Sequence, residues 1–513
     1  MQSPAHAEIH GEVRFLCAGT SGVVAGTSGA VAGTSRVVMS TISVDMLVRR
    51  KGGSFPTRFR YVGMAKSLNG VHISDGSVMS ARTRTGALFA AAAAVAAVLV
   101  TAVPATPAQG PPPVATAAKA TKVKVPDTAV LDGKRLADAK RRLDRGDPRL
   151  REALGHLTAR ADKWLGKGPW TVVDKPRPAP SGDPHDYLSQ APYWWPTKPK
   201  TPDNPWGCPY EQRDGERNPE VDTGTDRRDV ENVFDSTYEL SLAWYYTGDR
   251  EYAEHAAKVL RTWFLDPATR MNPNLDHGQF IPCKYDGRAI GIIDFSQSYT
   301  SVVDALAILG TGAPGWTSAD RAKMRSWTKS FQKWLVESQF GKDEVAAKNN
   351  HGTFYDMQLA ALAYANGDKA LARRTVLNAR AQRIDPQIAP DGSQPQELTR
   401  TRSWHYSTFD LVAYTRLADI GRHVGVDLWK YRGPDGQSLV KAVDYLLPAA
   451  TGSVKWPHPE LEFLRYAASD VVRAAADAGS AAAKAAVPKL ERPPGGDLWE
   501  LRPAAEQLDS IAG

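Results

Sequence analysis

The chain has 513 residues, of which 42% are hydrophobic and 23% are charged, and its formal net charge is +8. The first 108 residues hold ten Lys or Arg and four Asp or Glu, so only +2 remains on the rest of the chain. General basicity is therefore excluded as evidence for nucleic-acid binding, and we expect no nucleic-acid partner. The three cysteines include no Cys-x-x-Cys pair, which argues against a cysteine zinc site.

The N-terminal region divides into two parts. Residues 1–78 contain a Gly-Thr-Ser motif three times, scattered arginines and no sustained amphipathic period. Residues 79–108 hold two arginines, an apolar run from Ala87 to Val103 and small residues ending near Ala108, the pattern of a secretory signal peptide. We expect translation to begin at Met79, with residues 1–78 an over-extended and disordered stretch. The apolar run is short for a bilayer span, so we expect a periplasmic or extracellular protein without stable membrane association.

After an expected linker at residues 109–145, the chain shows helical periodicity to its end. Apolar residues recur at helical spacing in 149–165, 230–247, 250–264, 295–309, 318–339, 352–365, 369–384, 407–424, 438–447 and 460–478. Gly or Pro punctuation separates these segments, and strand-like alternation is scarce. The pattern predicts one all-α domain over residues 146–513, an incomplete (α/α) toroid of about five to seven helical hairpins. We expect it to be a monomer.

A long segment without helical pattern, residues 174–229, is rich in proline and aromatic residues. Structureless segments of this length in compact domains are usually functional, and aromatic rings stack on sugar faces. We therefore assign to substrate binding His185, Tyr187, Tyr193, Trp194 and Trp195, together with Gln297 from the start of a later helix. Alternatively, the aromatic residues close one end of the ring.

Two of the cysteines, Cys208 and Cys283, lie in the expected mature chain, whereas Cys17 lies in the doubtful N-terminal region. In an exported protein they form one disulfide or remain two free thiols, and the sequence leaves both alternatives open.

Two polar runs, Asn349-Asn-His-Gly-Thr-Phe-Tyr-Asp356 and Glu397-Leu-Thr-Arg-Thr-Arg-Ser-Trp-His-Tyr406, supply the groups that remove a proton beside a carboxylate. In a uronate polymer the C5 proton becomes acidic only if the charge of the C6 carboxylate is neutralised, which amide, imidazole and guanidinium donors can do. A tyrosine held near a cation can take that proton and protonate the departing O4. Asn350, His351, an arginine and Tyr406 fit these catalytic roles.

Each of these residues also has a simpler structural interpretation. An Asn-Asn pair is commonly a cap or turn, a histidine beside glycine is commonly structural, and Arg402 and Tyr406 are four apart and can be neighbours on one helix. Taken together, and with the aromatic segment, the functional interpretation is favoured.

The two runs, with Asp183-Pro-His-Asp-Tyr-Leu-Ser-Gln-Ala-Pro-Tyr-Trp-Trp-Pro196, resemble the alginate lyase superfamily, particularly its alginate and glucuronan lyase branch. The resemblance spans most of residues 145–480. It implies an (α/α) toroid in which Asn350 and His351 neutralise the carboxylate, Arg400 assists and Tyr406 transfers the proton. It also implies an acidic polysaccharide substrate, which we expect to be a β-1,4-linked mannuronate or glucuronate polymer.

The assignment to Arg400 has a structural requirement. In one unbroken helix over residues 397–410, Arg402 and not Arg400 would share the face of Tyr406. Arg400 therefore requires a bend, expected near the turn at 390–392, or a role shared with Arg402. We assign Arg402, Asn349 and His405 to substrate binding.

Three rival interpretations remain. A glycoside hydrolase would need two carboxyl groups flanking the bond, for which Glu397, Asp356, Asp186 and Glu231 are available. A non-catalytic carbohydrate-binding protein would keep the aromatic residues. A metal site would need convergence of His185, His351, His405 and His458, but no His-Glu-x-x-His spacing occurs. We expect neither a metal nor another cofactor.

Overall fold

Capping residues set the ends of the main helices. Asp147 accepts hydrogen bonds from two backbone N–H groups at the start of helix α2 (Pro148–Leu165). Gly248 ends α3 (Arg227–Thr247) in the left-handed conformation, with φ of 79°, and donates its N–H to a carbonyl of the last turn. These bonds satisfy backbone groups that a helix end leaves without partners, and glycine adopts positive φ without a steric penalty.

The computed structural model describes residues 42–50, 53–61 and 123–509. The remaining helices are α1 (Gly133–Asp144), α4 (Arg250–Leu260), α5 (Ile293–Ser296), α6 (Tyr299–Leu309), α7 (Ser318–Glu337), α8 (Gln339–Val345), α9 (Asn350–Ala365), α10 (Lys369–Ala379), α11 (Asp385–Gln387), α12 (Pro395–Leu398), α13 (Ser403–His423), α14 (Leu439–Ala450), α15 (Ser469–Asp477) and α16 (Ala481–Ala486). Short 3-10 or π segments are η1 (Val172–Asp174), η2 (Pro219–Asp222), η3 (Arg261–Leu265), η4 (Ala289–Ile292), η5 (Arg380–Ile384), η6 (Arg465–Ala468) and η7 (Val487–Lys489). The strands are β1 (Ile42–Arg50), β2 (Gly53–Tyr61), β3 (Leu188–Gln190), β4 (Trp194–Pro196), β5 (Tyr210–Gln212) and β6 (His277–Phe280).

The chain forms two units, residues 1–112 and 113–513. In the first, β1 and β2 pair as an antiparallel hairpin, which differs from the expectation of disorder across residues 1–78. The expected start at Met79 and the expected signal peptide at 79–108 lie outside the described residues.

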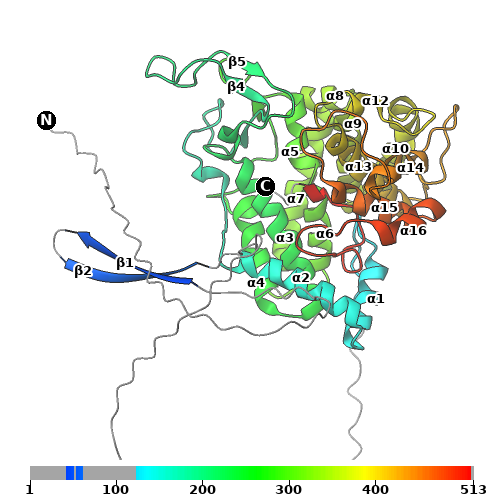
Figure 1. Cartoon of the computed structure of the whole chain (residues 1–513), viewed down its shortest axis with the longest axis horizontal. Coiled ribbons are helices and arrows are strands. Elements are labelled where there is room, and N and C mark those ends of the chain that lie inside the picture. The colour runs from blue at the N-terminus through cyan, green and yellow to red at the C-terminus, as the bar shows by residue number, and fades with distance from the viewer. Residues whose placement is uncertain (1–41, 51–52, 62–122, 510–513) are drawn as a thin grey trace, which may run out of the picture. The chain divides into compact units, whose positions relative to one another are not determined.

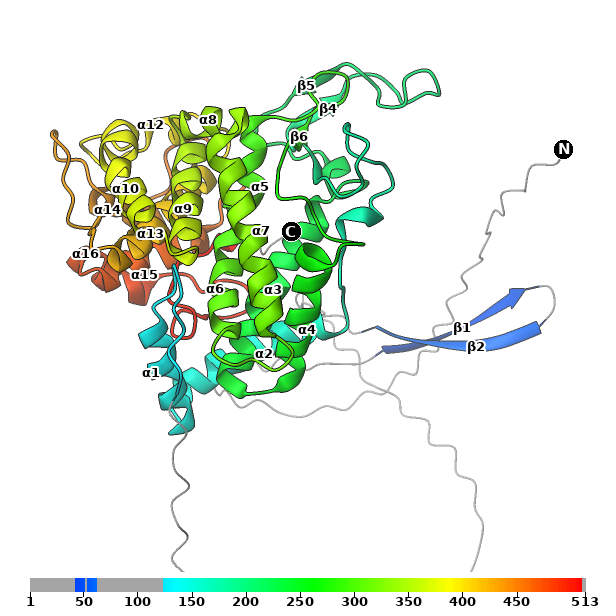
Figure 2. The same ribbon diagram turned by 180° about the vertical axis from the view of Figure 1, so that it is seen from behind.

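The helices of the second unit pack in chain order around a ring (Figures 1 and 2). Along the inner side, α3 contacts α6, α6 contacts α9, α9 contacts α13, and α13 contacts α15. Outer helices pack behind them: α2 and α4 on α3, α7 and α10 on α9, and α14 on α13. The predicted (α/α) toroid is confirmed.

Burial distinguishes the inner helices from the outer ones. In α9, every residue except His351 and Ala365 is buried, as expected for a helix covered on all sides. In α10, by contrast, Ala372, Thr375, Val376 and Ala379 are the buried positions, a single helical stripe. The sequence of α9 accordingly shows no single apolar stripe, and its buried positions include the polar residues Asn350, Asp356 and Gln358.

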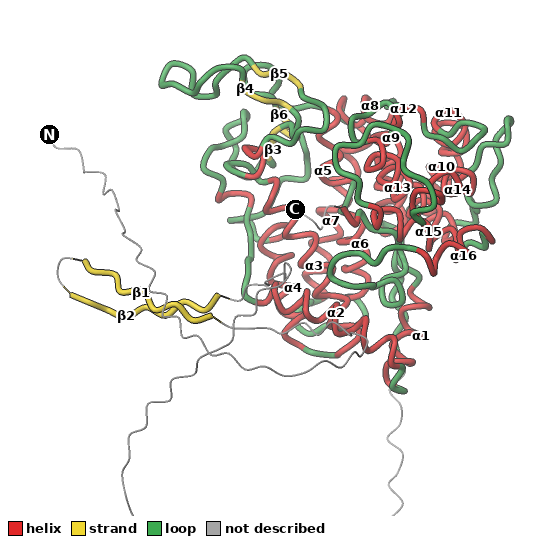
Figure 3. Tube along the Cα trace, in the orientation of Figure 1, coloured by secondary structure: helices red, strands yellow, loops and turns green. Residues whose placement is uncertain are grey.

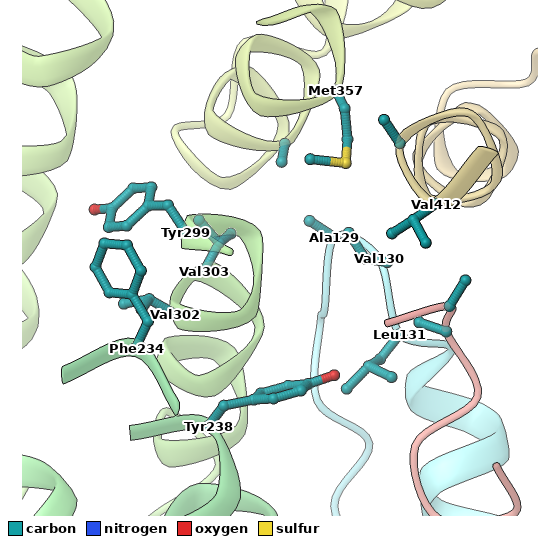
Figure 4. Close-up of a cluster of buried hydrophobic side chains, with 14 of the residues drawn as sticks. Ala129, Val130, Leu131, Phe234, Tyr238, Tyr299, Val302, Val303, Met357 and Val412 are labelled. Carbon is teal, nitrogen blue, oxygen red and sulfur yellow. The ribbon is translucent and has the colours of Figure 1, made fainter. Parts of the chain in front are cut away.

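The segment before α1 enters the ring. Asp304 of α6 accepts hydrogen bonds from the backbone N–H groups of Ala129 at 2.6 Å, Val130 at 3.1 Å and Leu131 at 2.7 Å. Figure 4 shows these three residues between side chains of α6, α9 and α13. Because this segment and α1 fold with the ring, the expected linker at 109–145 is corrected: the described domain begins before residue 146.

Two further boundaries differ from expectation. The bend expected near 390–392 lies instead at 399–402, between α12 and α13. The segment 174–229 contains the short strands β3, β4 and β5, because β3 pairs with β6 and β4 pairs with β5 (Figure 3). Both pairs are too short to show alternation in the sequence.

Cys208 and Cys283 form a disulfide, which decides between the two alternatives for these residues. The bond joins the segment between β4 and β5 to the segment after β6. Figures 1 and 2 show β4 and β5 at the end of the ring that also carries α8 and α12. Cys17 lies outside the described residues.

Candidate active site

Tyr406, in the first turn of α13, is the centre of a chain of polar contacts. Its hydroxyl donates a hydrogen bond to the hydroxyl of Tyr193 over 2.8 Å. The guanidinium carbon of Arg400 lies 3.6 Å from the centroid of its ring. Arg400 also donates to both carboxylate oxygens of Asp214, with Nη2 2.6 Å from Oδ1. The aromatic segment and the start of α13 therefore meet at Tyr406.

The break at 399–402 explains why Arg400 and not Arg402 reaches Tyr406. These residues are not helical, so the four-residue spacing of a helix face does not apply to them. Arg402 turns instead to Glu460, with Nε 3.9 Å from Oε1. The guanidinium of Arg402 therefore pairs with Glu460, whereas Arg400 contacts the ring of Tyr406.

Two glutamates cap the helices that carry the catalytic candidates. Glu397 accepts the backbone N–H of Asn350, the first residue of α9, over 2.9 Å. Glu460 accepts the N–H groups of Trp404 at 2.7 Å and His405 at 3.1 Å, in the first turn of α13. Negative charge at a helix N-terminus satisfies free N–H groups and is favoured by the helix dipole. Both caps fix the direction of the functional side chains.

Asn350 is 1% exposed, and its amide Nδ2 donates to Glu397 Oε2 over 2.9 Å. Glu397 thus binds both the backbone and the side chain of Asn350. Burial raises the pKa of Glu397, although its bonds to Asn350 act in the opposite direction. Only one of the two amide hydrogens is needed for this contact, so the second remains for another acceptor.

His351 is the residue of the first turn of α9 that is not buried. Its side chain is 19% exposed, and Nδ1 lies 2.7 Å from Oε1 of Glu344, whose side chain is 1% exposed. Burial alone would lower the pKa of His351, but the charges of Glu344 and Glu397 outweigh it, so its pKa is raised. The pair therefore favours an imidazolium whose Nε2 is available to an anion.

The phenol of Tyr406 is under opposing influences. Burial raises its pKa well above the ordinary value, and Tyr193 adds to this effect. The positive charge of Arg400 acts in the opposite direction and favours the phenolate. In the absence of substrate Tyr406 is protonated, so it can donate a proton, and its use as a base depends on Arg400.

The aromatic residues around Tyr193 are partly exposed and lie among cations. The Nζ of Lys284 lies 4.3 Å from the ring centroid of Trp194, and the guanidinium of Arg213 lies 5.2 Å from that of Trp195. Indole Nε1 of Trp195 donates to the carbonyl of Glu216 over 2.9 Å. These contacts hold both indoles in place next to Tyr193. We call the segment that contains Tyr193, Trp194 and Trp195 the aromatic wall.

Two of the assigned substrate-binding residues occupy other positions. Tyr187 is 0% exposed and donates to Asp294 over 3.2 Å, so it is a core residue, and its assignment to substrate binding is corrected. His405 forms a short hydrogen bond to Asp509, and its ring stacks on Phe409. These partners occupy its Nδ1 and one ring face.

The remaining assignments lie at partly exposed positions. His185 Nδ1 is bonded to the carbonyl of Arg270 over 2.7 Å. Gln297 follows α5, and Asn349 precedes α9 and accepts at its carbonyl from Gln387. None of these three contacts Tyr406 among the contacts of the described residues.

The four histidines considered for a metal do not converge. His351 pairs with Glu344, His405 with Asp509, and His458 with the hydroxyl of Tyr445. Within residues 42–50, 53–61 and 123–509, no group of three His, Cys, Asp or Glu side chains is arranged to hold a metal ion.

The carboxyl groups considered for a hydrolase each have another partner. Asp356 pairs with Arg383 at 2.8 Å, and Glu231 pairs with Arg227 at 2.7 Å. Asp186 accepts hydrogen bonds from two asparagine side chains, and Glu397 caps α9. These contacts hold the four groups in separate structural roles.

Glu344, Asp214 and Glu460 were not predicted from the sequence. Glu344 and His351 are seven apart on two different helices, and Asp214 is 186 positions from Arg400. An acidic residue with a role of this kind has no local signal, because its partner is set by the packing of distant segments.

Comparison with known proteins decides the family. The sequence model of the family described as Alginate lyase matches residues 171–456. A solved alginate lyase from Bacteroides ovatus is 34% identical, over 74% of this chain and 100% of that chain, with a TM-score of 0.69. This chain belongs to the alginate lyase family. The lyase is also similar to alginate lyase A1-III from Sphingomonas species A1, at 16% identity over 67% of this chain and 94% of that chain, with a TM-score of 0.41. A comparison with curated proteins gives no significant match.

The lyase is thus an enzyme of the polysaccharide lyase class, which excludes the non-catalytic alternative and the hydrolase. Its family implies an acidic polysaccharide as substrate. Among the described residues, no helix is both long and apolar enough to span a bilayer.

Proposed function

We propose that this lyase cleaves a β-1,4-linked uronate polymer, alginate rich in mannuronate or glucuronan, by β-elimination. The observation that carries the proposal is the position of Tyr406 between the hydroxyl of Tyr193 and the guanidinium of Arg400. It supplies a proton donor and acceptor next to a fixed positive charge, as elimination beside a carboxylate requires.

In the proposed reaction, Tyr406 removes the C5 proton and then protonates O4 of the departing sugar. The C5–H and C4–O4 bonds break, and a C4–C5 double bond forms. Because burial raises the pKa of Tyr406, the phenolate state needs the charge of Arg400, which Asp214 holds over the ring. Removal of the C5 proton turns the phenolate into the phenol, and transfer of that proton to O4 returns Tyr406 to the phenolate.

Neutralisation of the C6 carboxylate is assigned to His351 and Asn350. The raised pKa of His351 keeps it positively charged toward neutral pH, with Nδ1 bonded to Glu344 and Nε2 available to the carboxylate. The second amide hydrogen of Asn350 is a further donor, oriented by Glu397. Both residues lie in the first turn of α9, whose dipole also favours an anion.

The test is ultraviolet absorbance of the unsaturated uronate product, measured with the lyase and its Tyr406→Phe variant on polymannuronate, polyguluronate and glucuronan. A rise on polymannuronate or glucuronan that the variant loses supports the proposal. No rise on any of the three polymers would count against a polyuronate substrate. A rise that the variant retains would remove Tyr406 from the proton transfer.

One observation favours polyguluronate as a second substrate. Guluronate is the C5 epimer, so its proton lies on the other face of the sugar and needs another base. The carboxylate–imidazole pair of Glu344 and His351 leaves Nε2 free for that role once His351 is neutral. The raised pKa of His351 opposes the neutral state, so we expect slower cleavage of polyguluronate, with relatively more activity at high pH.

We further propose that the lyase is secreted through the signal peptide predicted at residues 79–108. The Cys208–Cys283 disulfide supports an oxidising compartment. N-terminal sequencing of the native protein tests this, with a start near Gln109 expected. A peptide from before Met79 would contradict the proposed translation start.

A further inference from the structure

Arg288 uses part of its guanidinium in hydrogen bonds to one residue, Gln279. It directly precedes η4, and its Nε donates to the carbonyl of Gln279 over 3.0 Å. Its Nη2 donates to the side-chain oxygen of the same glutamine over 3.1 Å. A guanidinium has five N–H donors, so three remain. Arg288 is partly exposed, so these donors can meet a ligand.

Arg288 differs from the buried arginines of the ring. Three arginines of the ring, Arg383, Arg416 and Arg502, each form an ion pair with a carboxylate. Within the part of the chain that the structure describes, Arg288 forms none. Burial lowers its pKa to about 10, although Asp294 and Glu344 act in the opposite direction from a distance. A partly desolvated cation without a carboxylate partner has a free energy that a bound anion would lower.

The residue that holds Arg288 has an uncommon backbone conformation. Gln279 has φ of 49°, and its side chain is buried. Its Nε2 donates to Asp294 over 3.0 Å, and its N–H donates to Ser189 over 2.8 Å. Positive φ is unfavourable for a residue with a side chain and persists where the surroundings impose it. The bonds of β3 and β6 thus fix Gln279, and Gln279 fixes the guanidinium.

Arg288 lies on the same side of the ring as the candidate active site. The segment η4 packs on α8, which carries Glu344, the partner of His351. The charge of Glu344 acts on the pKa values of both Arg288 and His351. The strand β3 next to Gln279 leads to Tyr193, the partner of Tyr406. A polymer at Tyr406 and His351 therefore passes within reach of this wall.

We propose that Arg288 binds the carboxylate of a sugar next to the one that loses its C5 proton. This inference rests on the proposed function, because a uronate polymer carries one carboxylate on each sugar. The fixed fork of the guanidinium suits a planar carboxylate, and its free donors supply the bonds. Arg288 thus binds substrate beyond the reacting sugar and takes no part in proton transfer.

The experiment compares full-length wild-type lyase with Arg288→Gln, Arg288→Lys and, as a matched control, Arg325→Gln, an exposed arginine on α7. Initial rates are measured by product absorbance on polymannuronate and on its oligomers of increasing length, at two salt concentrations, with melting temperatures recorded. We expect Arg288→Gln to raise KM for the polymer about tenfold or more with little change in kcat. Arg288→Lys should be intermediate, and the salt dependence of KM should weaken in Arg288→Gln.

The length series separates the outcomes. On the shortest oligomer that the wild type cleaves without filling the position at Arg288, wild type and Arg288→Gln should agree. A KM equal to that of Arg325→Gln at every length would overturn the proposal, as would an equal loss of kcat at every length. If the wild type yields no chromophore, the proposed function fails. Calorimetric binding of polymannuronate to wild type and Arg288→Gln would then still test Arg288.

Discussion

The guanidinium carbon of Arg400 lies over the ring of Tyr406, 3.6 Å from its centroid, and this contact exists because the chain leaves the helix between Leu398 and Ser403. In a continuous helix the arginine would project from another face. The break in the helix therefore places the positive charge of Arg400 next to the phenol of Tyr406. This contact links two hydrogen bonds, that of Arg400 to Asp214 and that of Tyr406 to Tyr193.

Tyr406→Phe should lower kcat by roughly 10²- to 10⁴-fold, because it removes the group that transfers the proton. The melting temperature should change little, since the phenyl ring remains under Arg400. Tyr285→Phe is the matched control, because Tyr285 is 49% exposed and should retain full activity. Equal kcat in both variants would contradict the role of Tyr406.

Asp214→Asn should lower kcat by up to roughly 100-fold, because the ion pair that orients Arg400 is lost and a small displacement is costly in a site of this kind. KM should change less. The pH profile separates positioning from a structural role. The charge of Asp214 raises the pKa of Tyr406, so its loss alone would shift activity to lower pH, whereas displacement of Arg400 would raise that pKa and shift activity to higher pH. We expect the displacement of Arg400 to outweigh the direct effect. An unchanged profile with a lowered melting temperature would indicate a structural role alone.

Glu344→Gln should move the high-pH loss of kcat/KM to lower pH. The sign follows from the pair: Glu344 raises the pKa of His351, so the imidazolium persists to higher pH in the wild type. Removing the carboxylate lowers that pKa, and the imidazolium is then lost earlier as pH rises. The pH profile on polymannuronate gives the measurement, and a shift toward higher pH would refute the assignment.

Cys208→Ser with Cys283→Ser should destabilise the protein by roughly 2–4 kcal/mol, because the bond closes a loop between residues 75 apart. The loss should fall on the wall that carries Tyr193, so KM should rise more than kcat falls. Denaturant unfolding and steady-state kinetics measure the two effects. Unchanged KM in the double variant would show that the wall keeps its place without the bond.

The sequence predicted the helices well where caps and turns mark their ends, as at Asp147 and Gly248. Helix α1 was not predicted from the sequence. Its few buried side chains, Leu136, Ala137 and Ala139, stand among many lysines and arginines, and their burial follows from packing on the ring. Periodicity alone gives no account of a helix that is short, charged and preceded by a proline-rich stretch.

The candidate site was predicted in its chemistry but not in its contacts. Asn350, His351 and Tyr406 stand in recognisable runs, whereas the choice between Arg400 and Arg402 depends on a break that no glycine or proline marks. Tyr187 belongs to the same aromatic run as Tyr193, yet it faces the core. The pairing of β3 with β6 decides which of these two tyrosines meets solvent. These strands lie far apart in the sequence, so no local pattern shows the outcome.

The backbone segment that Asp304 binds inside the ring limits where a polymer can bind. In the part of the chain that the structure describes, Ala129, Val130 and Leu131 fill the space between α6, α9 and α13, which closes the centre of the ring to a polysaccharide at this level. We therefore expect the polymer to lie across the end of the ring that carries Tyr406. On that arrangement, both products leave from the same end of the ring at which the polymer binds.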